Sequence, residues 1–182
     1  KELKFINKIV VSSDSRKAKK IANKLKVSFH QRDKYYANSK CSGSDFFENL
    51  AKNINGDYLM YCPCTSPIIS KQTYINFYNQ FLKKKLQYDS LNTVSILKSY
   101  IWKKNKPINY SAANAPNSQD LPDNYYALTF GINIISRKKM IKRKNIVGYK
   151  PFFFPLSKIE STDINDGVDF FLAKEIYNQY FS

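Results

Sequence analysis

The 182-residue sequence has no apolar run that approaches the roughly 20 residues needed to cross a membrane as a helix. Its first residues, Lys1-Glu2-Leu3-Lys4, contain no apolar core of the kind that a signal peptide carries. We therefore expect a cytoplasmic protein that has no membrane partner.

Metal-binding and phosphate-binding motifs are also scarce. Beside Cys62-Pro63-Cys64 the sequence has only one histidine and no second cysteine pair, so the two closely spaced ligand pairs of a typical zinc site are missing. We interpret the cysteines as thiols in a reducing compartment. The five glycines are scattered singly, so the sequence contains no glycine-rich phosphate loop. His30 stands beside Gln31 and Arg32 in a polar stretch and is interpreted as a surface residue.

The formal net charge of +16 suggests a nucleic-acid ligand, but the residue types do not support one. Only four of the 30 basic residues are arginine, the side chain that dominates specific phosphate and base contacts. Lysine is abundant together with Asn, Ile, Tyr and Phe, a set that an AT-rich genome encodes. We therefore expect no specific nucleic-acid partner, and we interpret the basic helix predicted at 136–144 as a solvated face.

Predicted strands and helices alternate along the chain. Short apolar or β-branched runs predict strands at 8–12, 27–29, 58–62, 90–97 and 126–135, and an edge strand between prolines at 151–156. Helical periodicity predicts helices at 16–25, 46–54, 71–85, 136–144 and 166–180. The alternation predicts one α/β domain over residues 1–182 with a largely parallel sheet, and the length suffices for a core of its own.

Each predicted helix has a recognisable start or apolar face. Asp14 or Ser15 can cap the first helix, and Ser44 or Asp45 can cap the second. The apolar faces are Ala18, Ile21, Ala22 and Leu25 in the first helix, Tyr74, Phe77, Tyr78 and Phe81 in the third, and Val168, Phe171, Leu172 and Ile176 in the last. We interpret the aromatic stripe of the third helix as core.

Residues 99–126 differ in composition from the rest of the chain. The segment is rich in Asn, Pro, Ser and Ala, contains the only tryptophan, Trp102, and is too long for an ordinary connection. We therefore expect it to serve function or to form an interface.

Three polar clusters follow predicted strands or precede a predicted helix, at 12–15, 65–67 and 160–166. In open α/β sheets, ligands bind beyond the carboxyl ends of the strands. Asp163 and Asn165 are two residues apart, so in an extended segment both side chains face one way and can hold a hard cation through oxygen. An Asp-rich helix start is more often a cap, and both interpretations stay open.

Five motifs recur in a familiar order. They are Val11-Ser12-Ser13-Asp14 at a strand end, the turn Thr65-Ser66-Pro67, the strand start Asp89-Ser90, the segment Gln119-Asp120-Leu121-Pro122 with Tyr125, and Ser161-Thr162-Asp163-Ile164-Asn165 followed by Asp169-Phe170 and Ala173. In this order, over nearly the whole chain, they resemble the acylneuraminate cytidylyltransferase family, the CMP-sialate and CMP-Kdo synthetase group.

The resemblance implies a Rossmann-like, three-layer nucleotidyltransferase fold with a mostly parallel mixed sheet. It implies transfer of CMP from CTP to a sialic-acid-like nonulosonic acid or related acceptor, with release of pyrophosphate and with Mg²⁺ as cofactor. Such sugar activation serves the biosynthesis of cell-surface polysaccharides. It further implies a homodimer formed partly by residues 99–126.

The resemblance also assigns roles to matching residues. Nucleotide binding falls to Asp14, Ser44, Thr65 and Ser66, and acceptor binding to Gln119, Asp120 and Tyr125. Asp163 is the expected catalytic residue, and Asp163 with Asn165 is the expected metal site.

The sequence departs from the family in several places. The family's opening strand and its loop of Arg, Ser-Lys and Lys-Asn, which embraces the triphosphate, have no counterpart here. We therefore expect that a preceding segment is missing and that these 182 residues alone do not turn over CTP. Pro63, Ile69, Ser118 and Phe130 replace family residues near the sugar acid, and Asn165 replaces a second metal-binding Asp. The alternative function is that of a catalytically inactive homologue serving as a binding or dimerisation module.

Overall fold

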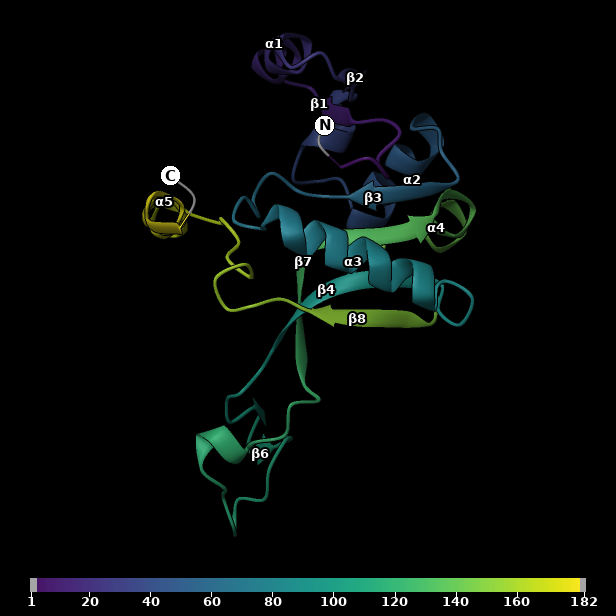
Figure 1. The fold of residues 1–182 in the computed structure, drawn as a ribbon. Helices are drawn as coiled ribbons and strands as arrows, with labels where there is room; N and C mark the ends of the chain where they lie inside the picture. The colour runs from purple at the N-terminus through teal and green to yellow at the C-terminus, as the bar shows by residue number, and fades with distance from the viewer. Residues whose placement is uncertain (1–2, 181–182) are drawn as a thin grey trace. The chain divides into compact units, whose positions relative to one another are not determined.

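The computed structural model describes residues 3–180 (Figure 1). In chain order the elements are β1 (Val10–Ser13), α1 (Arg16–Lys24), β2 (Ser28–Gln31), α2 (Gly43–Asn53), β3 (Tyr58–Tyr61), α3 (Lys71–Lys84), β4 (Ser90–Ile96), β5 (Trp102–Lys103), β6 (Lys106–Pro107), β7 (Tyr126–Ser136), α4 (Arg137–Arg143), β8 (Pro151–Pro155) and α5 (Gly167–Tyr180). Short 3₁₀ turns occupy Lys34–Ala37 and Ser118–Asp120. The predicted α/β class is confirmed, and predicted strands and helices lie within a few residues of observed ones.

The strands form three sheets, a division that the sequence pattern does not indicate. β1 and β2 pair in parallel, with Val10 opposite Ser28 and Ser13 opposite Gln31. A four-stranded sheet has the order β3-β7-β4-β8, and in it β3 runs antiparallel to β7. The short strands β5 and β6 pair with each other inside segment 99–126. β8 lies at a sheet edge, as its flanking prolines predict.

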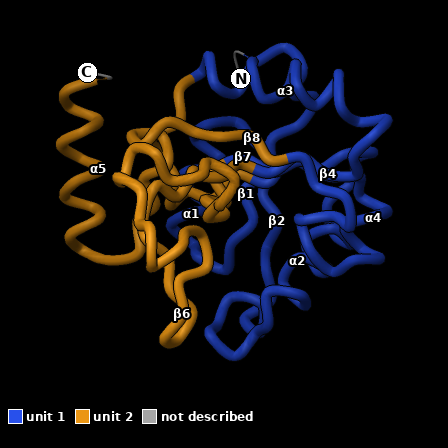
Figure 2. Tube along the Cα trace, turned by 90° about the horizontal axis from the view of Figure 1, so that it is seen from below, with its two compact units in different colours: residues 1–61, 71–92, 132–152 blue, residues 62–70, 93–131, 153–182 orange. Residues whose placement is uncertain are grey.

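The chain divides into two compact units (Figure 2). Unit 1 contains residues 1–61, 71–92 and 132–152, and unit 2 contains residues 62–70, 93–131 and 153–182. Each unit is therefore described by itself.

The core of unit 1 gathers around α2 and α4. Leu50 and Ala51 of α2 pack with Ile135 of β7, Met140 of α4 and Ile146. On α3, Phe77 and Phe81 are buried, which confirms the core interpretation of the aromatic stripe. Tyr78 of the same stripe stacks on Phe5, with ring centroids 4.0 Å apart. The apolar periodicity of these helices therefore predicts their buried faces correctly.

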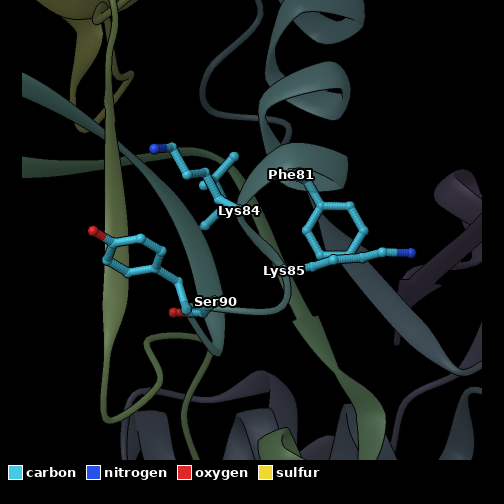
Figure 3. A pocket seen from close by; sticks show the side chains of 6 residues that line it. Phe81, Lys84, Lys85 and Ser90 are labelled. Carbon is cyan, nitrogen blue, oxygen red and sulfur yellow. The ribbon is translucent and has the colours of Figure 1, made fainter.

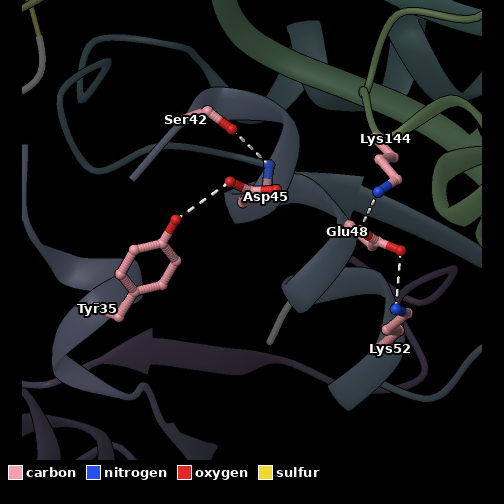
Figure 4. A network of polar contacts seen from close by, with 6 residues as sticks. All are labelled: Tyr35, Ser42, Asp45, Glu48, Lys52 and Lys144. Carbon is pink, nitrogen blue, oxygen red and sulfur yellow. Dashed lines mark hydrogen bonds and ion pairs between the residues drawn. The ribbon is translucent and has the colours of Figure 1, made fainter. Parts of the chain in front are cut away.

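Helix starts show one correct and one wrong prediction. Ser15 caps α1, because its side chain accepts a hydrogen bond from the Ala18 amide. The cap of α2 is Ser42, whose Oγ lies 3.0 Å from the Asp45 amide nitrogen, and not Ser44 or Asp45 (Figure 4). The helix begins at Gly43, three residues before the predicted start at 46, so Gly43, Ser44 and Asp45 form its first turn.

An ion-pair cluster joins α2 to the end of α4. Glu48 contacts the ammonium groups of Lys52 and Lys144, each at 2.8 Å (Figure 4). Hydrogen bonds from Lys144 first, and then from Lys52, hold the pKa of Glu48 below its ordinary value. Lys144 reaches Glu48 from the left-handed C-cap of α4, at φ 53°. The basic α4 is thereby anchored by an acidic residue of α2 as well as by buried Met140.

Two helices form as predicted but leave their apolar faces exposed. In α5, Val168, Phe171 and Leu172 are 50–67% exposed, and Ala173 is the buried residue. In α1, Ala22 is buried, whereas Ile21 and Leu25 are more than half exposed. Among the described residues, these two predicted apolar faces are therefore left largely uncovered. Periodicity indicates that a helix has an apolar face, but it does not indicate which surface, if any, packs against that face.

A buried polar network crosses from β4 to β7. The Asn92 amide donates to Asn133 Oδ1 at 2.9 Å and to the Ile146 carbonyl at 3.1 Å. Its Oδ1 accepts from the Ser90 hydroxyl at 2.8 Å, and Ser90 Oγ in turn accepts from the Gly148 amide. These groups are almost fully buried, so each hydrogen bond replaces one that water would otherwise make.

We predict that Asn92→Ala lowers the free energy of unfolding by about 1–3 kcal/mol, because buried partners lose their hydrogen bonds to this side chain. Urea denaturation followed by circular dichroism measures the change. Asn79→Ala, on the exposed side of α3, is the matched control and should change stability by less than about 0.5 kcal/mol. Equal effects of the two substitutions would contradict the assigned role of the network.

Candidate functional site

A turn and a distant segment of unit 2 are joined by two hydrogen bonds. The turn 62–67 is closed by a bond of 3.3 Å from the Ser66 amide to the Pro63 carbonyl. The Thr65 carbonyl accepts from the Ile164 amide at 2.8 Å. The Ser70 amide donates to Glu160 Oε1 at 3.0 Å. The structure thus brings the predicted residues Thr65 and Ser66 next to the segment that carries Asp163 and Asn165.

Ser66 is the buried polar residue of this turn. It is 7% exposed, and among the described residues its hydroxyl oxygen has no hydrogen-bond partner. A buried hydroxyl without a partner costs free energy, so such groups in native proteins commonly face a water molecule or a ligand. Thr65, beside it, is exposed. The turn therefore offers one exposed and one buried hydroxyl to a bound molecule.

The acidic residues around the start of α5 have different tasks. Asp166 Oδ1 accepts from the amides of Val168 and Asp169, at 2.8 and 2.9 Å, so Asp166 caps the helix. Asp169 Oδ2 accepts from the Asn165 amide at 2.9 Å. Asp163 is half-buried and lies outside the helix, and its Oδ2 accepts from Asn165 Nδ2 at 3.3 Å. Capping, the open alternative for Asp163, is therefore performed by Asp166.

The pair Asp163 and Asn165 meets only part of the requirement for a cation. Residues 3–180 contain no group of three His, Cys, Asp or Glu side chains placed to share a metal ion. The amide of Asn165 directs its nitrogen toward Asp163, and rotation of that amide would present its oxygen instead. One carboxylate and one carbonyl fit a magnesium ion that takes its other ligands from water and nucleotide phosphates.

In unit 1, a second polar cluster lies at the carboxyl ends of β1 and β2. Ser12 Oγ is 2.9 Å from His30 Nδ1, and Arg32 Nε donates to the same hydroxyl at 3.4 Å. Arg32 also donates to the carbonyls of Ser12 and Tyr36 and lies over the ring of Phe46, 4.9 Å from its centroid. Arg32 therefore fastens the end of β1 to the 3₁₀ turn that follows β2.

The contacts of Ser12 with His30 and Arg32 were missed by sequence reasoning, which interpreted His30 as a surface residue. The available signal was the parallel register, which sets Ser12 opposite His30 once β1 and β2 are paired. Burial first, and then the charge of Arg32, lower the pKa of His30. The predicted nucleotide-binding residues Asp14 and Ser44 also belong to unit 1, where both are exposed. The Asp14 carbonyl accepts from Gln31 Nε2 at 3.3 Å.

The predicted acceptor-binding residues Gln119, Asp120 and Tyr125 all lie within segment 99–126, where they make separate contacts. Gln119 and Asp120 form the 3₁₀ turn, and the Lys98 ammonium donates to the Gln119 carbonyl at 3.4 Å. Tyr125 donates its hydroxyl to the Ile108 carbonyl at 2.6 Å. Leu121, which is fully buried, anchors the same stretch. The segment is therefore held by its own contacts rather than being an open loop.

One further hollow lies between the end of α3 and the start of β4 (Figure 3). Its lining residues are Phe81, Lys84, Lys85, Tyr88, Ser90 and Leu91. Its volume is about 160 Å³ including open solvent, below the roughly 300 Å³ of the smallest usual ligand pockets. Because Ser90 already serves the buried network, we assign no ligand to this hollow.

No known family model matches this sequence, and no curated protein matches it. Solved structures do match its fold. A 4-diphosphocytidyl-2C-methyl-D-erythritol synthase from Anaerococcus prevotii superposes with a TM-score of 0.69 at 13% identity, over 98% of this chain and 81% of the other. A CMP:2-keto-3-deoxy-manno-octonic acid synthetase, solved with CTP, gives a TM-score of 0.61 at 8% identity, over 98% and 83%.

The bifunctional IspDF from Campylobacter jejuni is also similar, with a TM-score of 0.60 at 12% identity, over 90% of this chain. This chain spans 41% of that longer protein. Identities of 8–13% establish a shared fold and no more. The mixed α/β chain therefore has the nucleotidyltransferase fold of these neighbours.

We predict that acidification destabilises the protein through His30. Its pKa is lower folded than unfolded, so the unfolded state binds more protons and stability rises with pH. The contribution is fully present above about pH 6.5, the unfolded value, and is lost as pH falls through the folded pKa. Because His30 is the only histidine, His30→Gln should flatten the stability profile between pH 7.5 and 5.5. Thermal melts across this range test the prediction, and an unchanged slope in the variant would contradict it.

Proposed function

We propose that this chain acts, as part of a longer protein, in CTP-dependent cytidylyl transfer to a sialic-acid-like nonulosonic acid or related acceptor, with release of pyrophosphate. The observation that carries the proposal is the hydrogen bond between the Thr65 carbonyl and the Ile164 amide. It sets the buried, unpartnered hydroxyl of Ser66 beside the segment of Asp163 and Asn165. The likeness in fold to a synthetase that was solved with CTP supports the nucleotide.

The proposed roles follow from the chemistry of the side chains. Thr65 and Ser66 donate hydroxyl hydrogen bonds to the nucleotide. Asp163 is the charged ligand of a magnesium ion and Asn165 the weaker one, because a neutral amide supplies only a carbonyl dipole. A magnesium ion so held would neutralise phosphate charge during the transfer. An acceptor hydroxyl then forms a bond to the α-phosphorus of CTP while the bond to pyrophosphate breaks.

The acceptor remains a class rather than one compound. We propose Gln119, Asp120 and Tyr125 as its contacts. Ile69 and Ser118 stand where the resembling family has arginines, so two cationic partners for a sugar carboxylate are absent at these positions. An acceptor whose carboxylate is bound by other groups is therefore favoured over ordinary sialic acid.

We predict that Asp163→Ala weakens binding of CTP in the presence of Mg²⁺ by at least tenfold, because the site loses its only formal charge at the metal. Asn165→Asp should lower the Mg²⁺ concentration needed for half-maximal CTP binding. Isothermal titration calorimetry with the 182-residue chain measures both effects without requiring turnover.

Asp166→Asn is the matched control for this experiment. It weakens the cap of α5, at a cost of about 1 kcal/mol or less, but should leave Mg²⁺-dependent CTP binding within twofold of wild type. If Asp163→Ala lowers thermal stability and leaves CTP binding intact, Asp163 is a structural residue. If the protein with its preceding segment restored binds no CTP at millimolar concentration, the alternative of an inactive module replaces the enzyme proposal.

A homodimer through segment 99–126 is the second part of the proposal. Within this segment Tyr100, Trp102 and Ile108 are 44–52% exposed, although large apolar side chains usually pack against something. Tyr100 and Trp102 both contact the ring of Tyr110, so the exposed aromatics form one ordered group. A second copy of the same surface would bury this group on both chains.

We predict that the chain sediments as a dimer at micromolar concentration and that Ile108→Lys raises the dissociation constant at least tenfold, because it places a charge within the apolar contact. Leu86→Lys is the matched control, since Leu86 is 94% exposed and lies outside the segment. Sedimentation equilibrium measures both constants. A wild-type monomer, or equal weakening by both substitutions, would contradict the assigned interface.

A further inference from the structure

Two thiols flank the residue that begins the Thr65-Ser66 turn. Cys62 and Cys64 are both exposed and are separated by Pro63 alone. The third cysteine, Cys41, is half-buried and donates its Sγ hydrogen to the Ser42 carbonyl at 3.4 Å. The chain thus carries an accessible thiol pair and, elsewhere, a single thiol that serves as an internal reference.

Chain geometry places the pair within bonding range. Residues two apart lie at most about 7 Å apart between their Cα atoms, because each residue adds no more than 3.3–3.6 Å. Disulfides span Cα separations of about 4.4–6.8 Å, so the two ranges overlap and a bend at Pro63 suffices to bring the two sulfurs together. A ring closed around one proline is small and strained. Strained, exposed disulfides are easily reduced again, which is the behaviour of reversible rather than structural bonds.

The same backbone carries the contacts of the proposed site. The Pro63 carbonyl accepts from the Ser66 amide, and the Thr65 carbonyl accepts from Ile164. Drawing Cys62 and Cys64 together bends the chain at Pro63, which is the acceptor of the first of these bonds. We expect this bend to shift the Thr65 carbonyl away from the Ile164 amide, so that their hydrogen bond breaks.

We propose that Cys62 and Cys64 are a thiol-modification site that reacts with small-molecule disulfides and closes to an internal disulfide, releasing the Thr65 carbonyl from Ile164. One thiolate attacks the small disulfide, forms a mixed disulfide and expels one small thiol. The second thiolate attacks the protein sulfur of that mixed disulfide and expels the other small thiol. The pair is oxidised by two electrons, the small disulfide is reduced by two, and the two thiol protons leave on the released thiols.

The covalent step is tested with the reduced chain and oxidised glutathione, quenched with an alkylating reagent and analysed by mass spectrometry of peptides. The wild type should accumulate the Cys62–Cys64 disulfide. Cys62→Ser and Cys64→Ser should each accumulate a mixed disulfide to at least tenfold the wild-type level, because neither can resolve it. Cys41→Ser should behave as wild type. Stable mixed disulfides in the wild type, without the internal bond, would overturn the proposal.

The conformational step is tested by amide hydrogen exchange. Oxidation should raise the exchange rate of the Ile164 amide at least tenfold, and a reducing agent should restore it, whereas the amide of Leu50 in α2 should not change. Unchanged exchange at Ile164 in the oxidised chain would refute the coupling. Neither readout requires CTP. Loss of CTP binding on oxidation is also expected, and this additional effect rests on the proposed function. If the proposed function proves wrong, the two thiol tests still decide the present proposal.

Discussion

The candidate site of unit 2 depends on one backbone hydrogen bond, from the Ile164 amide to the Thr65 carbonyl. About a hundred residues separate the two partners, and closing a chain loop of that length costs conformational entropy. A single hydrogen bond contributes only about 0.5–1.5 kcal/mol net, so the surrounding contacts must share the cost. The second tie, from Ser70 to Glu160, does so at 3.0 Å. Together they convert two short polar segments, each unremarkable alone, into one site.

The burial of Ser66 follows from the same arrangement. Ser66 and Ile68, two residues apart, are both buried, whereas Pro67 between them is exposed. Alanine at this position would avoid the free-energy cost of burying a hydroxyl that makes no hydrogen bond, because alanine has no hydroxyl. A serine there makes sense when something outside the chain supplies the missing hydrogen bond. This is why Ser66 supports a ligand more strongly than exposed Thr65 does.

Sequence reasoning was successful where local pattern decides the outcome. Periodicity placed α3 and its buried Phe77, and the polar residues before an apolar run offered Asp14 or Ser15 as a cap, of which the structure uses Ser15. It failed where the outcome depends on contacts between distant residues. The exposed face of α5 carries the same periodicity as a buried one, and Arg32 gains its role only because parallel pairing brings Ser12 to it. The Ser42 cap was missed because Ser42, Ser44 and Asp45 all carry a side-chain oxygen that can accept a hydrogen bond from a helix amide.

The acidic residues near α5 show how structure divides chemically equivalent groups. Sequence alone gave Asp163 two possible tasks, and the cap is made by Asp166, which accepts two amides at the start of the helix. Asp169 accepts a third amide, from Asn165, and so fixes the backbone that carries that side chain. The helix start is thus satisfied by two of the three aspartates. The Asp163 carboxylate accepts a hydrogen bond from the neutral side-chain amide of Asn165. The capping bonds at the start of α5 go to Asp166 instead. Asp163 is therefore the half-buried carboxylate of this segment that helix capping does not use, and the one that we propose as the charged ligand of a magnesium ion.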